Sequence, residues 1–163
     1  MENKTKKIVF CALFAALTCV ATMVIKIPSP LSGYINLGDS VVLLSGWLLG
    51  PVYGFCAAAI GSALADIFYG YIVYFPATFI IKGLMAVVFY QLYVKIKNKK
   101  ANLLVSAIAA EAIMALGYYV FEGFLYGFKA AVINIPANLI QAVAGLITGL
   151  ILIKMFKRSN IKF

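Results

Sequence analysis

Histidine is absent from this sequence of 163 residues, arginine occurs once, and only five residues are acidic. The three cysteines, Cys11, Cys19 and Cys56, each lie inside an apolar run, so neither a zinc site nor a disulfide framework is expected. The G-x-x-x-x-G-K-[ST] phosphate loop is missing, which excludes ATP binding of that kind. A phosphoalcohol transferase would need clustered aspartates near an arginine, whereas Asp39 and Asp66 stand alone. We therefore expect no enzyme, no catalytic residue, no metal site and no cofactor.

Long polar stretches are also missing. Hydrophobic residues make up 64% of the chain and charged residues 12%, and the mean hydropathy is +1.02. Soluble domains are about half apolar and about a quarter charged, so the composition predicts an integral membrane protein surrounded by lipid. Spans of about 20 residues would use almost the whole chain. We expect one membrane domain over residues 1–163, with no room for a soluble catalytic or ATP-binding domain.

The formal charge of +9 is concentrated in three short flanks of the apolar runs. Eleven of the fourteen basic residues lie there: Lys4, Lys6, Lys7, Lys95, Lys97, Lys99, Lys100, Lys154, Lys157, Arg158 and Lys162. Such clustering is typical of loops that face the cytoplasm, so both termini are predicted to be cytoplasmic. Three patches at a membrane edge form no groove for a polyanion, and no nucleic-acid partner is expected.

Apolar runs separated by glycine, proline and charged residues predict an all-α integral membrane bundle of six transmembrane helices. The predicted segments are residues 8–25, 37–50, 51–68, 76–93, 103–121 and 135–153. Lysines precede the first segment, as in a signal peptide, but its 18 uncharged residues are long enough to remain as a span. The second segment, of about 14 residues, is short for a span and is also open to a re-entrant interpretation.

Polar side chains gather in the outer half of these segments, with Glu111 nearer the inner end as the exception. The residues that show this pattern are Asp39, Asp66, Lys82, Glu122, Asn134, Asn138 and Gln141. Because ionisable groups are costly inside a membrane, they indicate a functional site by default. We predict an interior cavity, open to the outside, in which a flat ring stacks and polar groups contact its edge. Its aromatic walls are expected from Trp47, Tyr71, Tyr74, Tyr118 and Tyr119.

Two structural interpretations stand beside this one. Asp66 and Lys82 flank the same outer connection and are candidates for a buried ion pair that fixes helix packing. Asn138 and Gln141 are also suited to hydrogen bonds between helices. Neither interpretation prevents these residues from lining the cavity.

Small residues in the first segment indicate a surface for close helix packing. Ala12 and Ala16 have A-x-x-x-A spacing, and Ala15 with Cys19 gives a second small pair. Gly145 with Gly149 repeats the spacing in the last segment. Such pairs are suited either to a partner helix or to packing inside the bundle, and the sequence leaves both open.

Several short motifs carry a family resemblance that covers nearly the whole chain. They are Tyr34-Ile-Asn36-Leu-Gly38-Asp39-Ser40, Gly50-Pro51, Gly61-Ser62-Ala-Leu-Ala-Asp66, Gly70-Tyr71, Ile81-Lys82-Gly83, Met114-Ala-Leu-Gly117-Tyr118 and Pro136-Ala-Asn138-Leu-Ile-Gln141. In this combination the sequence resembles the substrate-binding S components of energy-coupling-factor (ECF) vitamin transporters. Ala86 departs from the pattern, because a glycine is expected after Lys82-Gly83.

The resemblance implies six helices in the cell membrane of a prokaryote and a pocket on the extracellular side. The implied ligand is a small ring compound such as hydroxymethylpyrimidine, vitamin B6 or riboflavin. It also implies that Ala12 and Ala16 dock a transmembrane coupling protein, the T component, and that two ABC-type ATPase subunits complete the transporter. With the polar pattern, it gives the predicted ligand residues Asn36, Asp39, Asp66, Tyr71, Lys82, Tyr118, Glu122, Asn138 and Gln141.

A self-contained homo-oligomeric transporter or channel is the alternative function. It would need polar residues along a path to the cytoplasmic side, whereas the polar pattern stops at Glu111.

Overall fold

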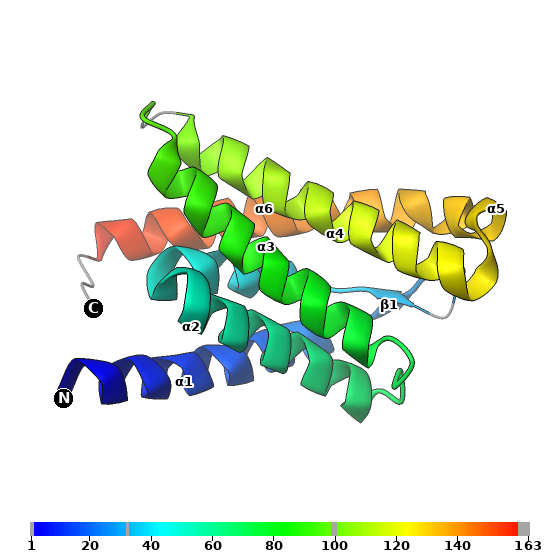
Figure 1. Ribbon diagram of the computed structural model, residues 1–163, viewed down its shortest axis with the longest axis horizontal. Helices are drawn as coiled ribbons and strands as arrows, with labels where there is room; N and C mark the ends of the chain where they lie inside the picture. The colour runs from blue at the N-terminus through cyan, green and yellow to red at the C-terminus, as the bar shows by residue number, and fades with distance from the viewer. Residues whose placement is uncertain (1, 32, 99–100, 160–163) are drawn as a thin grey trace.

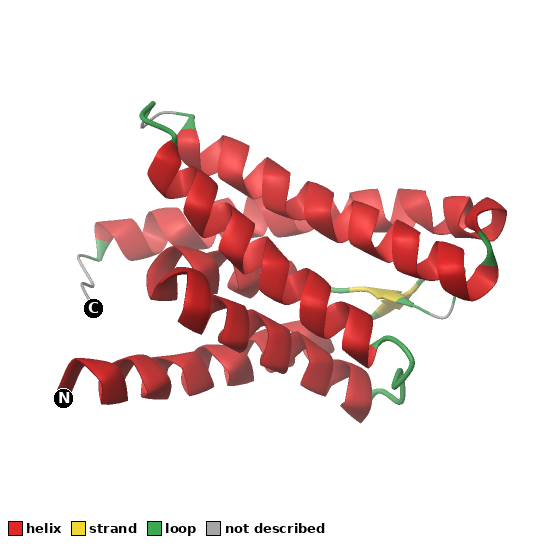
Figure 2. Cartoon of the chain, viewed as in Figure 1, coloured by secondary structure: helices red, strands yellow, loops and turns green. Residues whose placement is uncertain are grey.

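The computed structural model describes residues 2–31, 33–98 and 101–159, and helices make up most of them (Figures 1 and 2). Lys99, Lys100 and Lys162 lie outside the described residues. The elements are α1 (Glu2–Val24), β1 (Ile27–Pro28), β2 (Tyr34–Ile35), α2 (Gly38–Phe68), α3 (Phe75–Lys95), α4 (Asn102–Tyr126), α5 (Phe128–Ala131), η1 (Val132–Asn134) and α6 (Ile135–Arg158). The all-helical prediction is confirmed. Five helices within the described part are long and apolar enough to cross a membrane, counting Phe128–Arg158 as one.

The prediction of six separate helices was wrong in one place. The predicted segments 37–50 and 51–68 form a single element, α2, which is broken at Gly50. Gly50 has φ 77° and ψ −172°, a conformation that side chains disfavour, and Pro51 follows it. Figure 1 shows α2 running in one direction and then returning beside itself. The Ser45 hydroxyl lies 3.5 Å from the Gly54 carbonyl oxygen, so the two arms touch next to the bend.

The first arm of α2 is buried inside the bundle. Residues 38–46 are all buried, and the twelve residues 38–49 span about 18 Å at 1.5 Å per residue. This length is well short of a hydrocarbon core of about 30 Å. The arm starts beside the hairpin and turns at Gly50, where Leu48 and Leu49 lie near Lys6 and Lys7 of α1.

Small residues allow α1 and α2 to pack closely. A Cβ atom at Gly61 would lie 2.3 Å from the Ala15 carbonyl oxygen, so only glycine fits there. Ala15 and Cys19 are buried, and Ala12 and Ala16 point to the exposed side of α1. The two small pairs of this helix thus face in different directions.

The small residues of the last segment and Ala86 also lie inside the bundle. Gly145 and Gly149 are buried and lie against α2, so this pair serves internal packing. Ala86, where the resemblance indicates glycine, packs against Gly46. A Cβ atom at Gly46 would lie 2.6 Å from the Ala86 carbonyl oxygen, so the glycine of this contact stands on α2.

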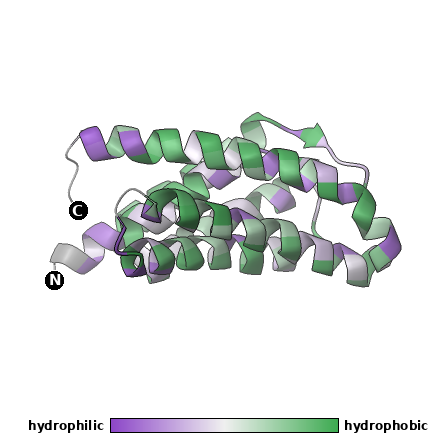
Figure 3. Cartoon of the chain, turned by 90° about the horizontal axis from the view of Figure 1, so that it is seen from above, coloured by the Kyte–Doolittle hydropathy of each residue, from purple (hydrophilic) through white to green (hydrophobic). Residues whose placement is uncertain are grey.

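Apolar side chains form both the core and the outer surface. The core includes Val42, Leu43, Met85, Phe89 and Met114. Apolar residues also run along most of the length of the helices (Figure 3), and many large ones are exposed, as lipid contact requires. Both termini lie at the same end of the bundle, together with the end of α3 and the start of α4 (Figure 1).

The two short strands make an antiparallel hairpin between α1 and α2. Ile27 pairs with Ile35 and Pro28 with Tyr34, and β2 contacts α6. The hairpin places Ser29 and residues 33–36 over polar side chains of α2, α3, α4 and α6, where they line a cavity.

Candidate ligand pocket

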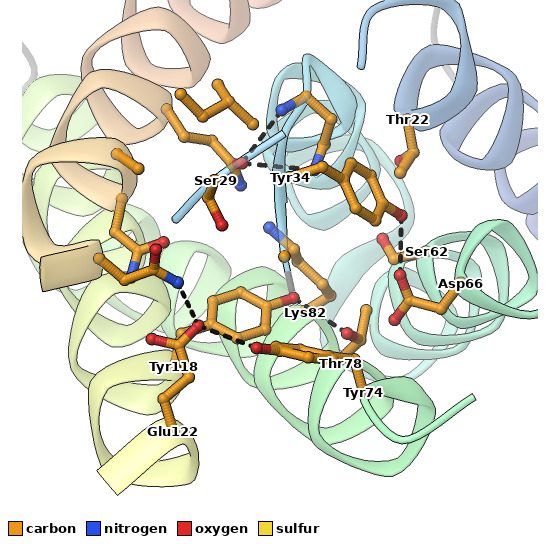
Figure 4. A pocket seen from close by; sticks show the side chains of 17 residues that line it. Thr22, Ser29, Tyr34, Ser62, Asp66, Tyr74, Thr78, Lys82, Tyr118 and Glu122 are labelled. Carbon is orange, nitrogen blue, oxygen red and sulfur yellow. Dashed lines mark hydrogen bonds between the residues drawn. The ribbon is translucent and has the colours of Figure 1, made fainter. Parts of the chain in front are cut away.

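A cavity beneath the β1–β2 hairpin is lined by polar side chains from most of the long helices (Figure 4). The volume open to the centre of a water molecule is about 30 Å³, enough for at least one water by this measure. The lining residues are Thr22, Ser29, Gly33, Tyr34, Ile35, Asn36, Ser62, Asp66, Tyr74, Thr78, Lys82, Tyr118, Glu122, Asn134, Ala137, Asn138 and Gln141. The site is therefore assembled from side chains of the hairpin and the long helices.

The structure brings most of the predicted ligand residues to this cavity. Those in its lining are Asn36, Asp66, Lys82, Tyr118, Glu122, Asn138 and Gln141. Asp39 does not line it; this side chain is fully buried and contacts Lys82. Tyr71 also lies outside the lining, with its ring centroid 5.0 Å from that of Tyr34.

The predicted aromatic walls are corrected in three places. Tyr74 and Tyr118 line the cavity, whereas Tyr71, Trp47 and Tyr119 do not. Trp47 lies under Lys157, whose Nζ is 5.8 Å from its ring centroid, near the C-terminus of the chain. Tyr119 packs on Phe128, with 5.9 Å between ring centroids. Tyr71 lies in the connection between α2 and α3, and for Tyr119 the rotation of α4 about its own axis decides the position.

A buried ion pair forms the base of the cavity. Lys82 Nζ contacts Asp39 Oδ1, and the two residues are 2% and 0% exposed. The alternative ion pair, between Lys82 and Asp66, is therefore wrong. The Asp39 carboxylate also accepts a hydrogen bond of 2.8 Å from Gln141 Nε2. Since a buried charge is tolerated when it is paired and hydrogen-bonded, both charges are accommodated.

Hydrogen bonds connect this base to the hairpin. Gln141 Oε1 accepts the backbone N–H of Asn36 at 3.1 Å and its side-chain amide at 3.3 Å. Asn36 Oδ1 in turn accepts the N–H of Gly38 at 2.9 Å, at the start of α2. Asn36 and Gln141 thus join the end of the hairpin to α6 and to the Asp39 carboxylate. Gln141 serves the interhelical role considered for it, and it lines the cavity as well.

Each of the two acidic residues in the cavity wall, Asp66 and Glu122, accepts a hydrogen bond from a tyrosine. The Tyr34 hydroxyl donates to Asp66 Oδ1 at 2.7 Å. The Tyr74 hydroxyl donates to Glu122 Oε1 at 3.3 Å, and Asn134 Nδ2 donates to the same oxygen at 2.6 Å. Burial, together with the Asp66 charge, raises the pKa of the Tyr34 hydroxyl far above its usual range, so it remains a donor.

Tyr34 lines the cavity, although the sequence pattern did not indicate it as a wall residue. The contacts that hold the hairpin were not predicted either. Lys26 Nζ lies 4.1 Å from the ring centroid of Tyr69, 4.7 Å from that of Tyr71 and 5.7 Å from that of Tyr34. An ammonium over aromatic faces is stabilising, and this cluster fastens the hairpin to the end of α2. Strands of two residues carry no periodicity, so the sequence pattern could not indicate them.

Comparison with known proteins gives consistent matches over nearly the full chain. The family model described as the S component of the ECF-type riboflavin transporter matches residues 2–158. A Pyrococcus woesei protein, named only as an uncharacterised protein in the gap 3′ region, is 37% identical over 131 residues, which cover 80% of this chain and 87% of that one. The thiamine precursor transporter HmpT of Lactococcus lactis subsp. cremoris (strain MG1363) is 26% identical over 164 residues, covering 99% and 94%.

A solved structure supports the fold independently. It is described as the structure of the S component of a bacterial ECF transporter, and it matches this chain with a TM-score of 0.76. The match covers 95% of this chain and 97% of that one at 22% sequence identity. The two chains therefore share their fold.

The ion pair at the base makes a prediction for stability. Lys82→Ala leaves the Asp39 carboxylate buried without its counter-charge, so the free energy of unfolding should fall by about 3–5 kcal/mol. Lys82→Met combined with Asp39→Leu replaces the pair by apolar side chains and should recover most of this loss. Reversible unfolding of the purified protein in mixed micelles measures both effects. The matched control is Lys82→Met with Asp66→Asn; recovery in the control and not with Asp39→Leu would show that the pair is misassigned.

Proposed function

Because the chain belongs to the ECF-type riboflavin transporter S-component family, we propose that it captures a small water-soluble vitamin or vitamin precursor at the outer face of the membrane. The captured molecule occupies the cavity under the hairpin and enters the cell through a larger, ATP-driven complex. The single observation that carries this proposal is the blind polar cavity at one end of an otherwise apolar bundle.

The end of the cavity inside the bundle distinguishes a binding subunit from a channel. Next to the Lys82–Asp39 pair, Val42, Leu43 and Met85 are fully buried and apolar, and the buried Ser45 and Glu111 side chains do not line the cavity. A channel or a self-contained transporter would need polar groups along a continuous path. The structure thus favours a binding subunit over the homo-oligomeric alternative.

The orientation in the membrane follows from the basic flanks. Lys4, Lys95 and Lys157 belong to elements that end where both termini lie, and loops rich in lysine face the cytoplasm. The hairpin then faces outward, in the cell membrane of a prokaryote. Labelling of whole cells by an impermeant thiol reagent decides the orientation, since a cysteine at Lys129 should react and one at Lys97 should not.

The partners that we propose are a T component and two ABC-type ATPase subunits. The exposed face of α1 with Ala12 and Ala16 suits the transmembrane partner, because small side chains let a second helix approach closely. Ala15 and Cys19 are already used against α2, so this outer face remains available. The ligand cavity lies on the opposite side of α1, near Thr22.

The proposed capture function predicts an effect of Tyr118 on affinity. In the isolated chain, one compound in a panel of B vitamins and their ring precursors should bind at a one-to-one ratio. Tyr118→Ala should weaken that binding by about 1 to 3 kcal/mol, a tenfold to hundredfold rise in Kd, because it removes ring contact inside the cavity. Isothermal titration of the purified chain measures the change. Tyr119→Ala, on the same helix but outside the cavity, is the matched control and should leave Kd unchanged.

The proposed docking face predicts a separate phenotype. Ala16→Leu places a bulky side chain on the exposed face of α1, so it should block assembly with the T component and ATP-driven uptake. Vitamin affinity of the isolated chain should stay within about threefold, because the cavity lies elsewhere. Co-purification measures assembly, with Ala112→Leu as the control at an exposed alanine of α4. Normal assembly of the Ala16→Leu protein would refute the assignment of this face.

A further inference from the structure

A second cavity lies between the start of α1, the bend of α2 and the last turns of α3. It is lined by Lys6, Lys7 and Phe10, by Leu48, Leu49 and Gly50 at the bend, and by Tyr90. The volume open to the centre of a water molecule is about 340 Å³, against about 30 Å³ for the cavity under the hairpin. A volume of this size is typical of ligand pockets. Among the described residues the two cavities share none, so vitamin capture does not account for the second one.

The charged side chains of this second cavity are two exposed lysines, and the described part of its lining contains no acidic residue. Lys7 Nζ lies 6.0 Å from the ring centroid of Tyr53, a contact that keeps this side chain beside the second arm of α2. The acids whose side chains the structure describes are buried elsewhere in the bundle; they are Asp39, Asp66, Glu111 and Glu122. Two ammonium groups at one cavity without a nearby carboxylate attract an anion.

The rest of the lining is mainly apolar. Phe10, Leu48 and Leu49 are half-buried side chains. Lys6 and Lys7 directly precede the first apolar run of the sequence, so the cavity lies where the hydrocarbon region meets the water. It therefore has a cationic rim at the membrane surface and an apolar wall on the hydrocarbon side.

A ligand with one anionic and one apolar part matches both halves of this lining. A soluble phosphate would satisfy the lysines and leave the apolar wall uncovered. In an anionic phospholipid the head group meets the ammonium groups while an acyl chain covers the apolar side chains. A zwitterionic lipid also carries a cationic group, which the two lysines repel, so it fits less well.

We propose that this second cavity binds one anionic phospholipid, with the head-group phosphate at Lys6 and Lys7 and an acyl chain along Phe10, Leu48 and Leu49. Tyr90 lines the same cavity and adds a hydroxyl group to its polar side. The lipid lies between α1 and the bend of α2. The proposal is independent of which compound the hairpin cavity captures, because the two cavities are separate.

The lipid site and the proposed docking face of α1 point in different directions. Phe10 is two residues from Ala12 and six from Ala16. At about 100° per residue, Phe10 is turned about 160° from Ala12 and about 120° from Ala16 around the helix axis. A partner helix on the alanine face therefore leaves the second cavity open to the bilayer.

The test compares two lipids with identical acyl chains. Phosphatidylglycerol and phosphatidylcholine are titrated separately into the purified full chain in detergent, and native mass spectrometry counts the bound molecules. The first phosphatidylglycerol should bind about tenfold or more tightly than the first phosphatidylcholine. Inorganic phosphate and glycerol 3-phosphate, added in about hundredfold excess, should not displace it, because they leave the apolar wall uncovered. Equal affinity for the two lipids, or displacement by either soluble phosphate, would overturn the proposal.

A pair of double variants separates a defined site from general attraction to a basic surface. Lys6→Gln with Lys7→Gln should weaken phosphatidylglycerol by about tenfold and remove its advantage over phosphatidylcholine. The matched control is Lys95→Gln with Lys97→Gln, which removes the same charge from exposed lysines at the same end of the bundle but outside the lining. The control should keep the preference. An equal loss in both double variants would contradict the proposal.

The T component is the other occupant that the same experiment can reveal. The Lys6→Gln, Lys7→Gln protein should still co-purify with the T component, because the alanine face of α1 is unchanged. Loss of co-purification, with phosphatidylglycerol bound as tightly as before, would assign the second cavity to the partner and refute the lipid site.

Discussion

A lysine cannot remain inside an apolar bundle without a counter-charge, and the pair between Lys82 and Asp39 meets this requirement. The pair joins α3 to the first arm of α2. Through Asp39 it reaches Gln141 on α6, and through Gln141 it reaches Asn36 at the end of the hairpin. The ion pair at the base of the cavity, Gln141 in its wall and Asn36 of the hairpin are therefore connected by hydrogen bonds. Asp39 lies in the first turn of the short arm of α2 and meets Lys82 there.

Much of the fold follows from composition and spacing. Apolar runs and lysine flanks predict helices and place both termini at one end, as the structure has them. The partner of Lys82 could not be found in this way. Asp66 is the nearer acid along the chain, whereas Asp39 reaches Lys82 only because the chain reverses at Gly50. Glycine followed by proline indicates a break, but it does not specify whether the two arms form separate spans or one bent element.

The pocket was predictable in its chemistry and less so in its walls. Acidic and amide residues recur on one side of several segments, and seven of nine predicted ligand residues line the cavity. Tyr71, Trp47 and Tyr119 were assigned to the wall because they are aromatic and near helix ends. Trp47 lies near Lys157 at the other end of the bundle, Tyr71 lies between α2 and α3, and the position of Tyr119 depends on the rotation of α4, which packing determines. Tyr34 lies on a strand too short to leave a pattern in the sequence, and only the folded chain brings it to Asp66.

We propose that ligand binding and partner docking use separate parts of the molecule. The ligand binds under the hairpin, and the T component docks on the outer face of α1. Hydrogen exchange of the purified chain, with and without its tightest-binding vitamin, tests this most directly. Backbone amides of residues 33–37 and the ends of α2 and α4 around Asp66 and Glu122 should become protected. Amides near Lys95 and Lys157 should not change. Protection confined to that lysine-rich end, with none at the hairpin, would contradict the account.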